Sequence, residues 1–169
     1  MKLHSIEAVV RALNEAGIRY LIAGGLAVNA HGYPRLTRDI DLVLALDSDN
    51  ILRAFEALKN VDYLPVVPVT ALQFADAATR KQWIEEKGTK VLGFFSDGHR
   101  ETPLGVFVYE PFDFDVEFAT SFKDELRPGL EVRFVSIPTL IDMKEVANRP
   151  KDIDDIQHLR WILEERDKR

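Results

Sequence analysis

The segment Tyr20-Leu-Ile-Ala-Gly-Gly-Leu-Ala-Val-Asn-Ala-His-Gly-Tyr-Pro-Arg-Leu-Thr-Arg-Asp-Ile-Asp-Leu-Val-Leu44 combines a Gly-Gly pair with an Asp-x-Asp pair. Residues 20–23 are apolar and predict a buried strand, and Leu26 to Ala30 predict the start of a helix. Between them, Gly24 and Gly25 permit a sharp turn and a close approach of the backbone to a ligand. Free N–H groups at the start of a helix bind phosphate. We therefore predict a phosphate site at this turn.

The two aspartates belong to a second predicted strand, Asp39-Ile-Asp-Leu-Val-Leu44. The period of two along a strand places Asp39 and Asp41 on one face, roughly 7 Å apart at the Cα atoms. Two like charges in these positions repel each other unless a cation or a basic partner neutralises them. A Gly-Gly pair alone is usually an ordinary turn, and an Asp-x-Asp alone is usually a solvated strand end. Together they favour a phosphate site that depends on Mg²⁺.

The pattern Gly-Gly followed by Arg35-x-Thr37-x-Asp39-x-Asp41 resembles the nucleotidyltransferase superfamily built on a polymerase-β-like palm. The resemblance is strongest to the small bacterial branch that includes AbiEii-type toxins and antibiotic nucleotidyltransferases. It implies an α/β (α+β) fold with a mixed twisted sheet flanked by helices and a short C-terminal helical element. It also implies transfer of an NMP from an NTP to an acceptor hydroxyl, with two Mg²⁺ ions as cofactor. Many members carry Ser after the first Gly, whereas here Gly25 leaves more of the phosphate contact to backbone N–H groups.

The superfamily has a third carboxylate on a later strand, and Phe112-Asp-Phe-Asp-Val-Glu-Phe-Ala119 offers candidates for it. Alternation of apolar and acidic residues predicts a strand with Asp113, Asp115 and Glu117 on one face. The resemblance selects Asp115 as metal ligand and general base, with Asp113 as the alternative. A solvated strand edge without metal is the other interpretation. A hairpin through Glu110-Pro-Phe would bring this strand beside the Asp39 strand.

The segment from Ile137 to Leu159 resembles the C-terminal helical element of the same proteins. Pro138 predicts a helix start, and Pro150 separates that helix from a second one over Lys151–Glu164. The resemblance implies nucleotide or pyrophosphate contacts from six residues, namely Gly24, Gly25, Arg35, Thr37, Lys144 and Asp152. An ion pair between Lys144 and Asp152 at a helix junction is the alternative interpretation.

Other elements follow from periodicity and capping. We expect a helix capped by Ser5 and closed by Gly17, a helix capped by Asp49 or Asn50, an edge segment at Tyr63–Val69, a helix over residues 71–87 and a strand at Val91–Phe95. Trp83 is expected to be a packing residue.

The composition predicts one globular domain spanning residues 1–169, with 46% hydrophobic and 30% charged residues. No apolar run is long enough to cross a bilayer and the start lacks a signal-peptide core, so a cytoplasmic location without membrane association is expected. The chain has no cysteine and 4 scattered histidines, which argues against a zinc site. The net charge of −6 argues against a surface that is basic all over, although it does not exclude tRNA.

The acceptor stays open between a protein hydroxyl, a tRNA 3′ end and a small molecule, and so does the choice of NTP. Two other classes of function compete with transfer. In the first, the chain is a degenerate member of the fold that binds nucleotide or a partner protein without turnover. In the second, it is an interaction module such as one half of a toxin–antitoxin pair, for example a toxin whose antitoxin partner covers the site.

Overall fold

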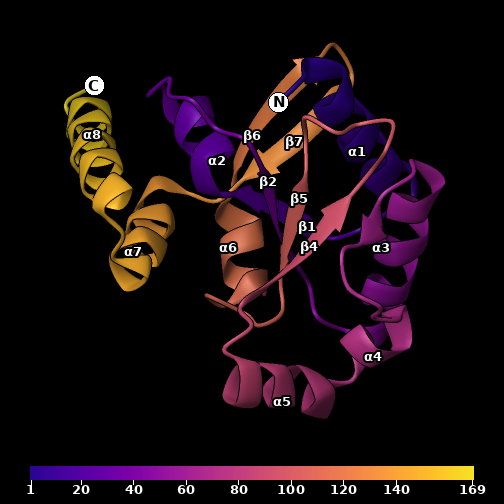
Figure 1. Ribbon diagram of the computed structural model, residues 1–169. Helices are drawn as coiled ribbons and strands as arrows, with labels where there is room; N and C mark the ends of the chain where they lie inside the picture. The colour runs from indigo at the N-terminus through magenta and orange to yellow at the C-terminus, as the bar shows by residue number, and fades with distance from the viewer.

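The computed structural model describes residues 1–169 and contains a seven-stranded sheet with helices on both faces (Figure 1). The strands are β1 (Tyr20–Ala23), β2 (Ile40–Leu44), β3 (Leu64–Pro65), β4 (Val91–Phe95), β5 (Leu104–Phe107), β6 (Phe122–Arg127) and β7 (Leu130–Phe134). The helices are α1 (Leu3–Glu15), α2 (Gly24–His31), α3 (Ser48–Asn60), α4 (Ala71–Ala75), α5 (Ala77–Lys87), α6 (Phe114–Thr120), α7 (Ile137–Ala147) and α8 (Pro150–Asp167).

The strand order is β3-β4-β5-β2-β1-β7-β6, and parallel and antiparallel pairs alternate irregularly along it. β1 is antiparallel to β2 and parallel to β7, whereas β5 is parallel to β2 and antiparallel to β4. The predicted mixed sheet with flanking helices is therefore confirmed. In this register Asp41 lies opposite Ala23 on one side and opposite Gly105 on the other.

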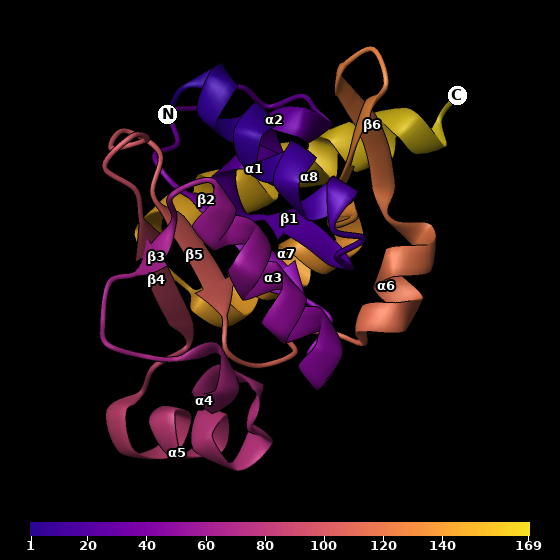
Figure 2. The same ribbon diagram turned by 90° about the vertical axis from the view of Figure 1, so that its right-hand side faces the viewer.

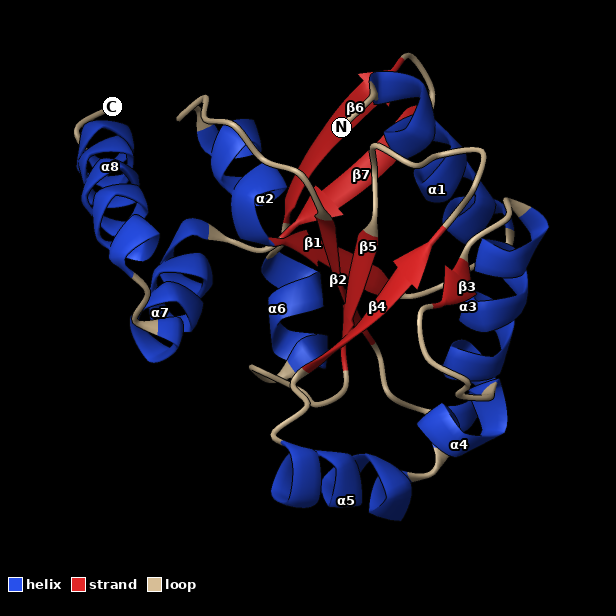
Figure 3. Ribbon diagram, in the orientation of Figure 1, coloured by secondary structure: helices blue, strands red, loops and turns tan.

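The helices form two layers, as Figures 2 and 3 show. α1 and α3 cover one face of the sheet, and α2, α7 and α8 lie on the other, while α4 and α5 extend beyond one end of the strands. The core between the layers consists of apolar side chains from both, and all four residues of β1 are buried. Burial of these side chains is the main favourable term in folding. No helix combines the length and the apolar character needed to cross a membrane.

Several predicted boundaries shift for local reasons. Ser5 lies inside α1 and bonds to His99, so it is not the cap of that helix. The N-cap of α3 is Asp47, whose side chain accepts a hydrogen bond from the Asn50 N–H. The predicted helix over 71–87 is two helices, because Asp76 ends α4 and caps α5. Trp83 packs against Phe74 with ring centroids 6.2 Å apart, as expected of a packing residue.

The largest error concerns the predicted strand Asp113–Phe118, which is the helix α6. Two carboxylates favour the helix, since the Asp113 side chain accepts the Val116 N–H and the Glu110 side chain accepts the Phe114 N–H. Phe114 and Phe118 stack at 5.5 Å, a contact that the four-residue spacing of a helix allows. The hairpin that follows, β6–β7, forms one edge of the sheet.

The two C-terminal helices are confirmed as predicted. Pro138 and Pro150 both lie in the first turn of their helices, where a missing N–H costs nothing. Asn148 ends α7 in the left-handed conformation, with φ of 49°. α8 continues three residues beyond the predicted end at Glu164.

Candidate functional site

The Gly24 backbone lies directly against the Asp41 carboxylate. A Cβ atom at position 24 would lie 1.9 Å from Asp41 Oδ2, and the residue has φ of +63°. Only glycine satisfies both conditions without strain. The start of α2, with its free N–H groups, is therefore held beside the carboxylate of the Asp-x-Asp pair, as the sequence predicts.

Gly25 lies beneath the loop that joins α2 to β2. A Cβ at position 25 would lie 2.5 Å from Thr37 Oγ1 and 3.0 Å from a terminal nitrogen of Arg35. Both predicted binding residues thus come together at the start of α2. The Thr37 hydroxyl therefore occupies the space next to position 25.

Asn29 fixes this loop, a role that the sequence analysis missed. Its side-chain nitrogen donates to the Arg35 carbonyl at 3.0 Å, and its side-chain oxygen accepts the Arg35 N–H at 2.9 Å. Such paired bonds to one backbone unit hold it in place as a neighbouring strand would. In the sequence, the only signal for this role is an asparagine within the helix that begins at the Gly-Gly pair.

Asp39 is exposed immediately before β2, and Asp41 is half-buried within it. Burial and the neighbouring charge of Asp39 raise the pKa of Asp41 from 3.8 to about 6, while Arg149, Lys144 and Lys151 oppose the shift. The two carboxylates therefore interact electrostatically, as their spacing predicts. Such a pair is more stable beside a cation.

The basic residues of the α7–α8 junction lie near Asp41 but are engaged with buried carboxylates. Lys144 Nζ, which is buried, donates to Asp155 at 2.7 Å and to Asp152 at 3.4 Å. Arg35 reaches the same Asp155 at 3.0 Å. This network joins the α2–β2 loop to α7 and α8, and so it holds both sides of the candidate site together.

Asp152 is fully buried and cannot contact a nucleotide, which corrects the role implied by the resemblance. Burial alone would raise the pKa of Asp152. Hydrogen bonds from Arg149 and the charge of Lys144 outweigh burial and lower this pKa. The alternative interpretation, a Lys144–Asp152 ion pair at the helix junction, is confirmed. Arg149 has a half-exposed side chain that also bonds Asp152 at 2.8 Å, and its charge acts on Asp41. Among Arg35, Lys144 and Arg149, the side chain of Arg149 is the most exposed.

Asp115 does not lie with the other two aspartates, so its assignment as third carboxylate is wrong. It is exposed on α6 and forms an ion pair with Arg19. Arg19 precedes Tyr20, the end of β1 that pairs with Leu44, whereas Asp41 pairs with the opposite end. The other candidates are occupied as well. Asp113 caps α6, and Glu117 is buried and accepts bonds from Ser136 and Thr139.

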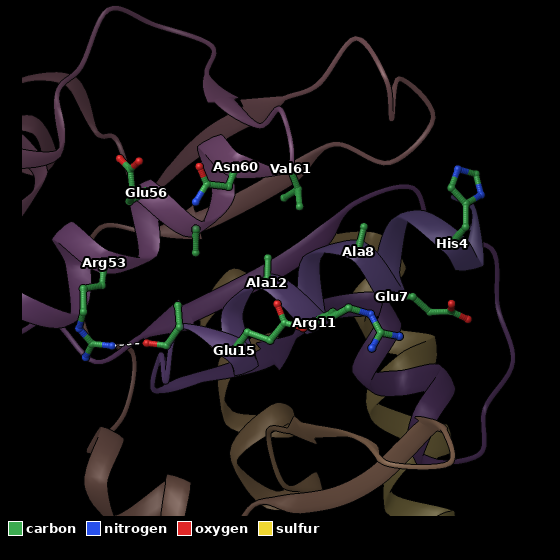
Figure 4. A pocket seen from close by; sticks show the side chains of 12 residues that line it. His4, Glu7, Ala8, Arg11, Ala12, Glu15, Arg53, Glu56, Asn60 and Val61 are labelled. Carbon is green, nitrogen blue, oxygen red and sulfur yellow. Dashed lines mark hydrogen bonds between the residues drawn. The ribbon is translucent and has the colours of Figure 1, made fainter.

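A separate hollow lies elsewhere, between α1 and α3 (Figure 4). Its volume is about 810 Å³, and alanines and charged side chains of both signs line it. An Arg53 hydrogen bond to the Ala16 carbonyl crosses one end. None of the glycines, carboxylates and basic residues around Asp41 lines it, so it is not part of the candidate site.

The sequence matches no protein-family model and no curated protein. Solved structures do resemble the fold. ANT(2″)-Ia in complex with adenylyl-2″-tobramycin superposes with a TM-score of 0.62 at 14% identity, over 95% of this chain and 88% of that one. An antigenic nucleotidyltransferase-like protein from Paracoccidioides brasiliensis gives 0.57 at 22% identity, over 93% and 74%. The lincomycin-bound lincosamide antibiotic adenylyltransferase LnuA gives 0.54 at 13% identity, over 89% and 90%.

The chain has a nucleotidyltransferase fold. Within this fold the strand beside Asp41 is β5, and the residue opposite Asp41 is Gly105. A Cβ at that position would lie 3.1 Å from Asp41 Oδ1 and 2.8 Å from a methyl carbon of Val91. The space directly above Gly105 is therefore occupied by the side chains of Asp41 and Val91.

The carboxylates present fit a Mg²⁺ site. Asp39, Asp41 and nucleotide oxygens together form the oxygen-only ligand set that Mg²⁺ prefers, because this ion usually takes one or two carboxylates plus phosphate. No group of three His, Cys, Asp or Glu side chains in the structure is placed to hold a metal ion by itself, so the triphosphate oxygens have to complete the ligand set. The second ion implied by the resemblance stays a prediction.

Proposed function

We propose that the chain is a Mg²⁺-dependent nucleotidyltransferase that moves an NMP from an NTP to a hydroxyl group of a small-molecule acceptor. The observation that carries the proposal is the contact between Gly24 at the start of α2 and the Asp41 carboxylate. Helix N–H groups favour phosphate, and the paired carboxylates favour a cation. The same point can therefore hold a metal–triphosphate.

The residues around this contact have separable roles. The N–H groups at Gly24 and Gly25 bind phosphate oxygens, and the Thr37 hydroxyl adjoins them. Arg149, with Arg35 and Lys144 behind it, provides the positive charge that favours departure of pyrophosphate. Asp39 and Asp41 would hold Mg²⁺, which when bound neutralises negative charge on the triphosphate.

The reaction balances without a further reactant. The acceptor oxygen forms a bond to the α-phosphorus, and the bond from that phosphorus to the bridging oxygen breaks. The electron pair leaves with pyrophosphate, and the hydroxyl proton passes to solvent. In-line geometry places the acceptor and pyrophosphate on opposite sides of the α-phosphorus.

A small-molecule acceptor is supported by two of the similar structures, one in complex with adenylyl-2″-tobramycin and the other bound to lincomycin. A toxin role and an antitoxin partner remain predictions from the resemblance. One observation favours the second candidate function, nucleotide binding without turnover. Gly105 stands where a carboxylate would be closest to Asp41, so activation of the acceptor lacks an obvious base.

Calorimetric titration with each of the four NTPs, with and without Mg²⁺, tests the site. We expect binding that requires Mg²⁺ and is lost in Asp41→Asn. Asp115→Asn is the matched control, because Asp115 is exposed at the other end of β1. Equal nucleotide affinity in wild-type chain and in Asp41→Asn would contradict the proposal.

A further inference from the structure

An uncovered apolar area adjoins Asp41 on the same face of the sheet. On β4, Leu92 and Phe94 are buried, while the alternating residues Val91 and Phe95 are 39% and 46% exposed. Leu64 is paired with Phe95 and is also exposed, as is Val66 at 56%. We refer to Leu64, Val66, Val91 and Phe95 as the apolar strip.

Register places the apolar strip on the side of the sheet that carries Asp41. Asp41 is opposite Gly105, and Gly105 is opposite Gly93 on β4. Directly paired residues point to the same face, so this face continues from Asp41 across β5 to β4. Val66 completes the row, because its side chain lies 3.2 Å from the point where a Gly93 Cβ would be.

Val91, at one end of the strip, lies next to the Asp41 carboxylate. Asp41 Oδ1 and a Val91 methyl carbon lie within 3.1 Å and 2.8 Å of the same point above Gly105. With neighbouring strands about 4.8 Å apart, Asp41 and Val66 are separated by roughly 14 Å. A molecule lying on the strip can thus place one end beside a phosphate held at Asp41.

The order of strands also indicates on which side of Asp41 the pyrophosphate leaves and on which side the acceptor binds. α2 follows β1 and α7 follows β7, so the helix start, Arg35 and Arg149 lie on the β1 side of β2. The strip lies on the β5 side. Since pyrophosphate departs toward positive charge and in-line attack comes from the opposite direction, the acceptor approaches over β5 and β4.

We propose that the apolar strip is the acceptor site of the chain and that it selects an uncharged aromatic or aliphatic alcohol over a polycationic sugar. This proposal rests on the function proposed above. All four residues of the strip are apolar, and exposed apolar side chains gathered beside a polar site are typical of ligand recognition. Selection of a polycation would need carboxylates beyond Asp41, and none of the four side chains of the strip is acidic.

The test uses 2-naphthalenemethanol, a fluorescent uncharged alcohol, titrated into the full chain with and without Mg²⁺ and an α,β-methylene NTP analogue. We expect Phe95→Ser to raise the dissociation constant of the alcohol about tenfold, which corresponds to about 1.4 kcal/mol of lost contact. Val66→Ser should weaken binding in the same direction. Val116→Ser is the matched control, because Val116 is exposed on α6, outside the strip. Nucleotide affinity should stay within twofold in all three variants.

Several results would overturn the proposal. The first is that the wild-type chain does not bind the alcohol, and the second is that Phe95→Ser binds it as tightly as the wild-type chain does. The third is that tobramycin displaces the alcohol with a dissociation constant lower than that of the alcohol itself. A wild-type dimer in sedimentation that Phe95→Ser converts to monomer would instead assign the strip to a second copy of the chain. The alcohol is also titrated without nucleotide, and nucleotide binding is measured separately. Loss of alcohol binding alone therefore counts against the strip, whereas loss of nucleotide binding alone counts against the proposed function.

Discussion

Replacement of Gly24 by alanine tests the contact on which the candidate site depends. The residue has φ of +63°, and its added Cβ would lie 1.9 Å from Asp41 Oδ2 and 2.9 Å from Asp41 Cγ. The left-handed conformation costs about 1–2 kcal/mol for alanine. Moving the Asp41 side chain away from its preferred rotamer adds about 0.5–1.5 kcal/mol. We expect Gly24→Ala to lower the free energy of unfolding by roughly 2–3 kcal/mol.

Gly88 provides a control with the same backbone conformation and no collision. Its φ is +64°, and nothing lies within 4 Å of a Cβ placed there. Gly88→Ala should therefore cost only the conformational term of about 1–2 kcal/mol. The excess of Gly24→Ala over Gly88→Ala should disappear when Asp41 is also replaced by alanine, because the two substitutions are coupled.

The assay is urea unfolding at one pH of Gly24→Ala, Gly88→Ala, Asp41→Ala and the double variant Gly24→Ala/Asp41→Ala, together with calorimetric titration of Mg²⁺–NTP. Gly24→Ala should weaken nucleotide binding at least about tenfold, or 1.4 kcal/mol, since the carboxylate is displaced. Gly88→Ala should leave it unchanged. If both glycine variants lose the same stability and bind nucleotide as the wild-type chain does, Gly24 is an ordinary turn residue and the reasoning is refuted.

Two further predictions concern buried charge. The pKa of Asp41 is raised to about 6, so its folded value exceeds the unfolded one and stability falls as pH rises from about 4 to 6. Asp41→Asn should therefore stabilise the metal-free chain by roughly 3 kcal/mol at pH 7 and by less than about 1 kcal/mol near pH 4. An equal gain at both pH values would contradict this. Asp155→Ala removes the partner of both Lys144 and Arg35 and should cost about 3–5 kcal/mol in urea unfolding. Asp142→Ala, which replaces an exposed residue on α7, is the control and should cost under about 0.5 kcal/mol. If Asp155→Ala and Asp142→Ala lower the free energy of unfolding equally, the buried network does not stabilise the fold.

The elements around the phosphate site could be predicted because their signals are local. An apolar run followed by Gly24 and Gly25 predicts strand, turn and helix, and alternation about Asp41 predicts the next strand. Each of these patterns involves residues that are close together in the sequence. The contact between Gly24 and Asp41 follows from antiparallel pairing of those two strands, which the short connection between them allows.

The error at Asp115 has a physical reason. In residues 112–119 the phenylalanines fit a period of two, yet the spacing between Phe114 and Phe118 also fits a helix. The deciding contacts are the caps from Glu110 and Asp113, which a periodicity count does not weigh. A cap residue directly before a short amphipathic run was the available signal.

Other features depend on tertiary register and could not be predicted. Nothing in the local sequence places Gly105 opposite Asp41 or gathers Val66 and Phe95 on the same face. Burial likewise decides between the two interpretations of Lys144 and Asp152, because the same residues fit an ion pair or a phosphate contact. The structure buries both and leaves Arg149 half-exposed.

Transfer of a labelled nucleotide tests the proposed function most directly. The full chain is incubated with each α-³²P-labelled NTP, Mg²⁺ and the small-molecule fraction of a cell extract, in parallel with Asp41→Asn and Asp115→Asn. We predict that wild-type chain and Asp115→Asn move the label into a new small-molecule product and release pyrophosphate, whereas Asp41→Asn and reactions with EDTA do not. Nucleotide binding without any labelled product, or undiminished transfer by Asp41→Asn, would contradict metal-dependent transfer at this site.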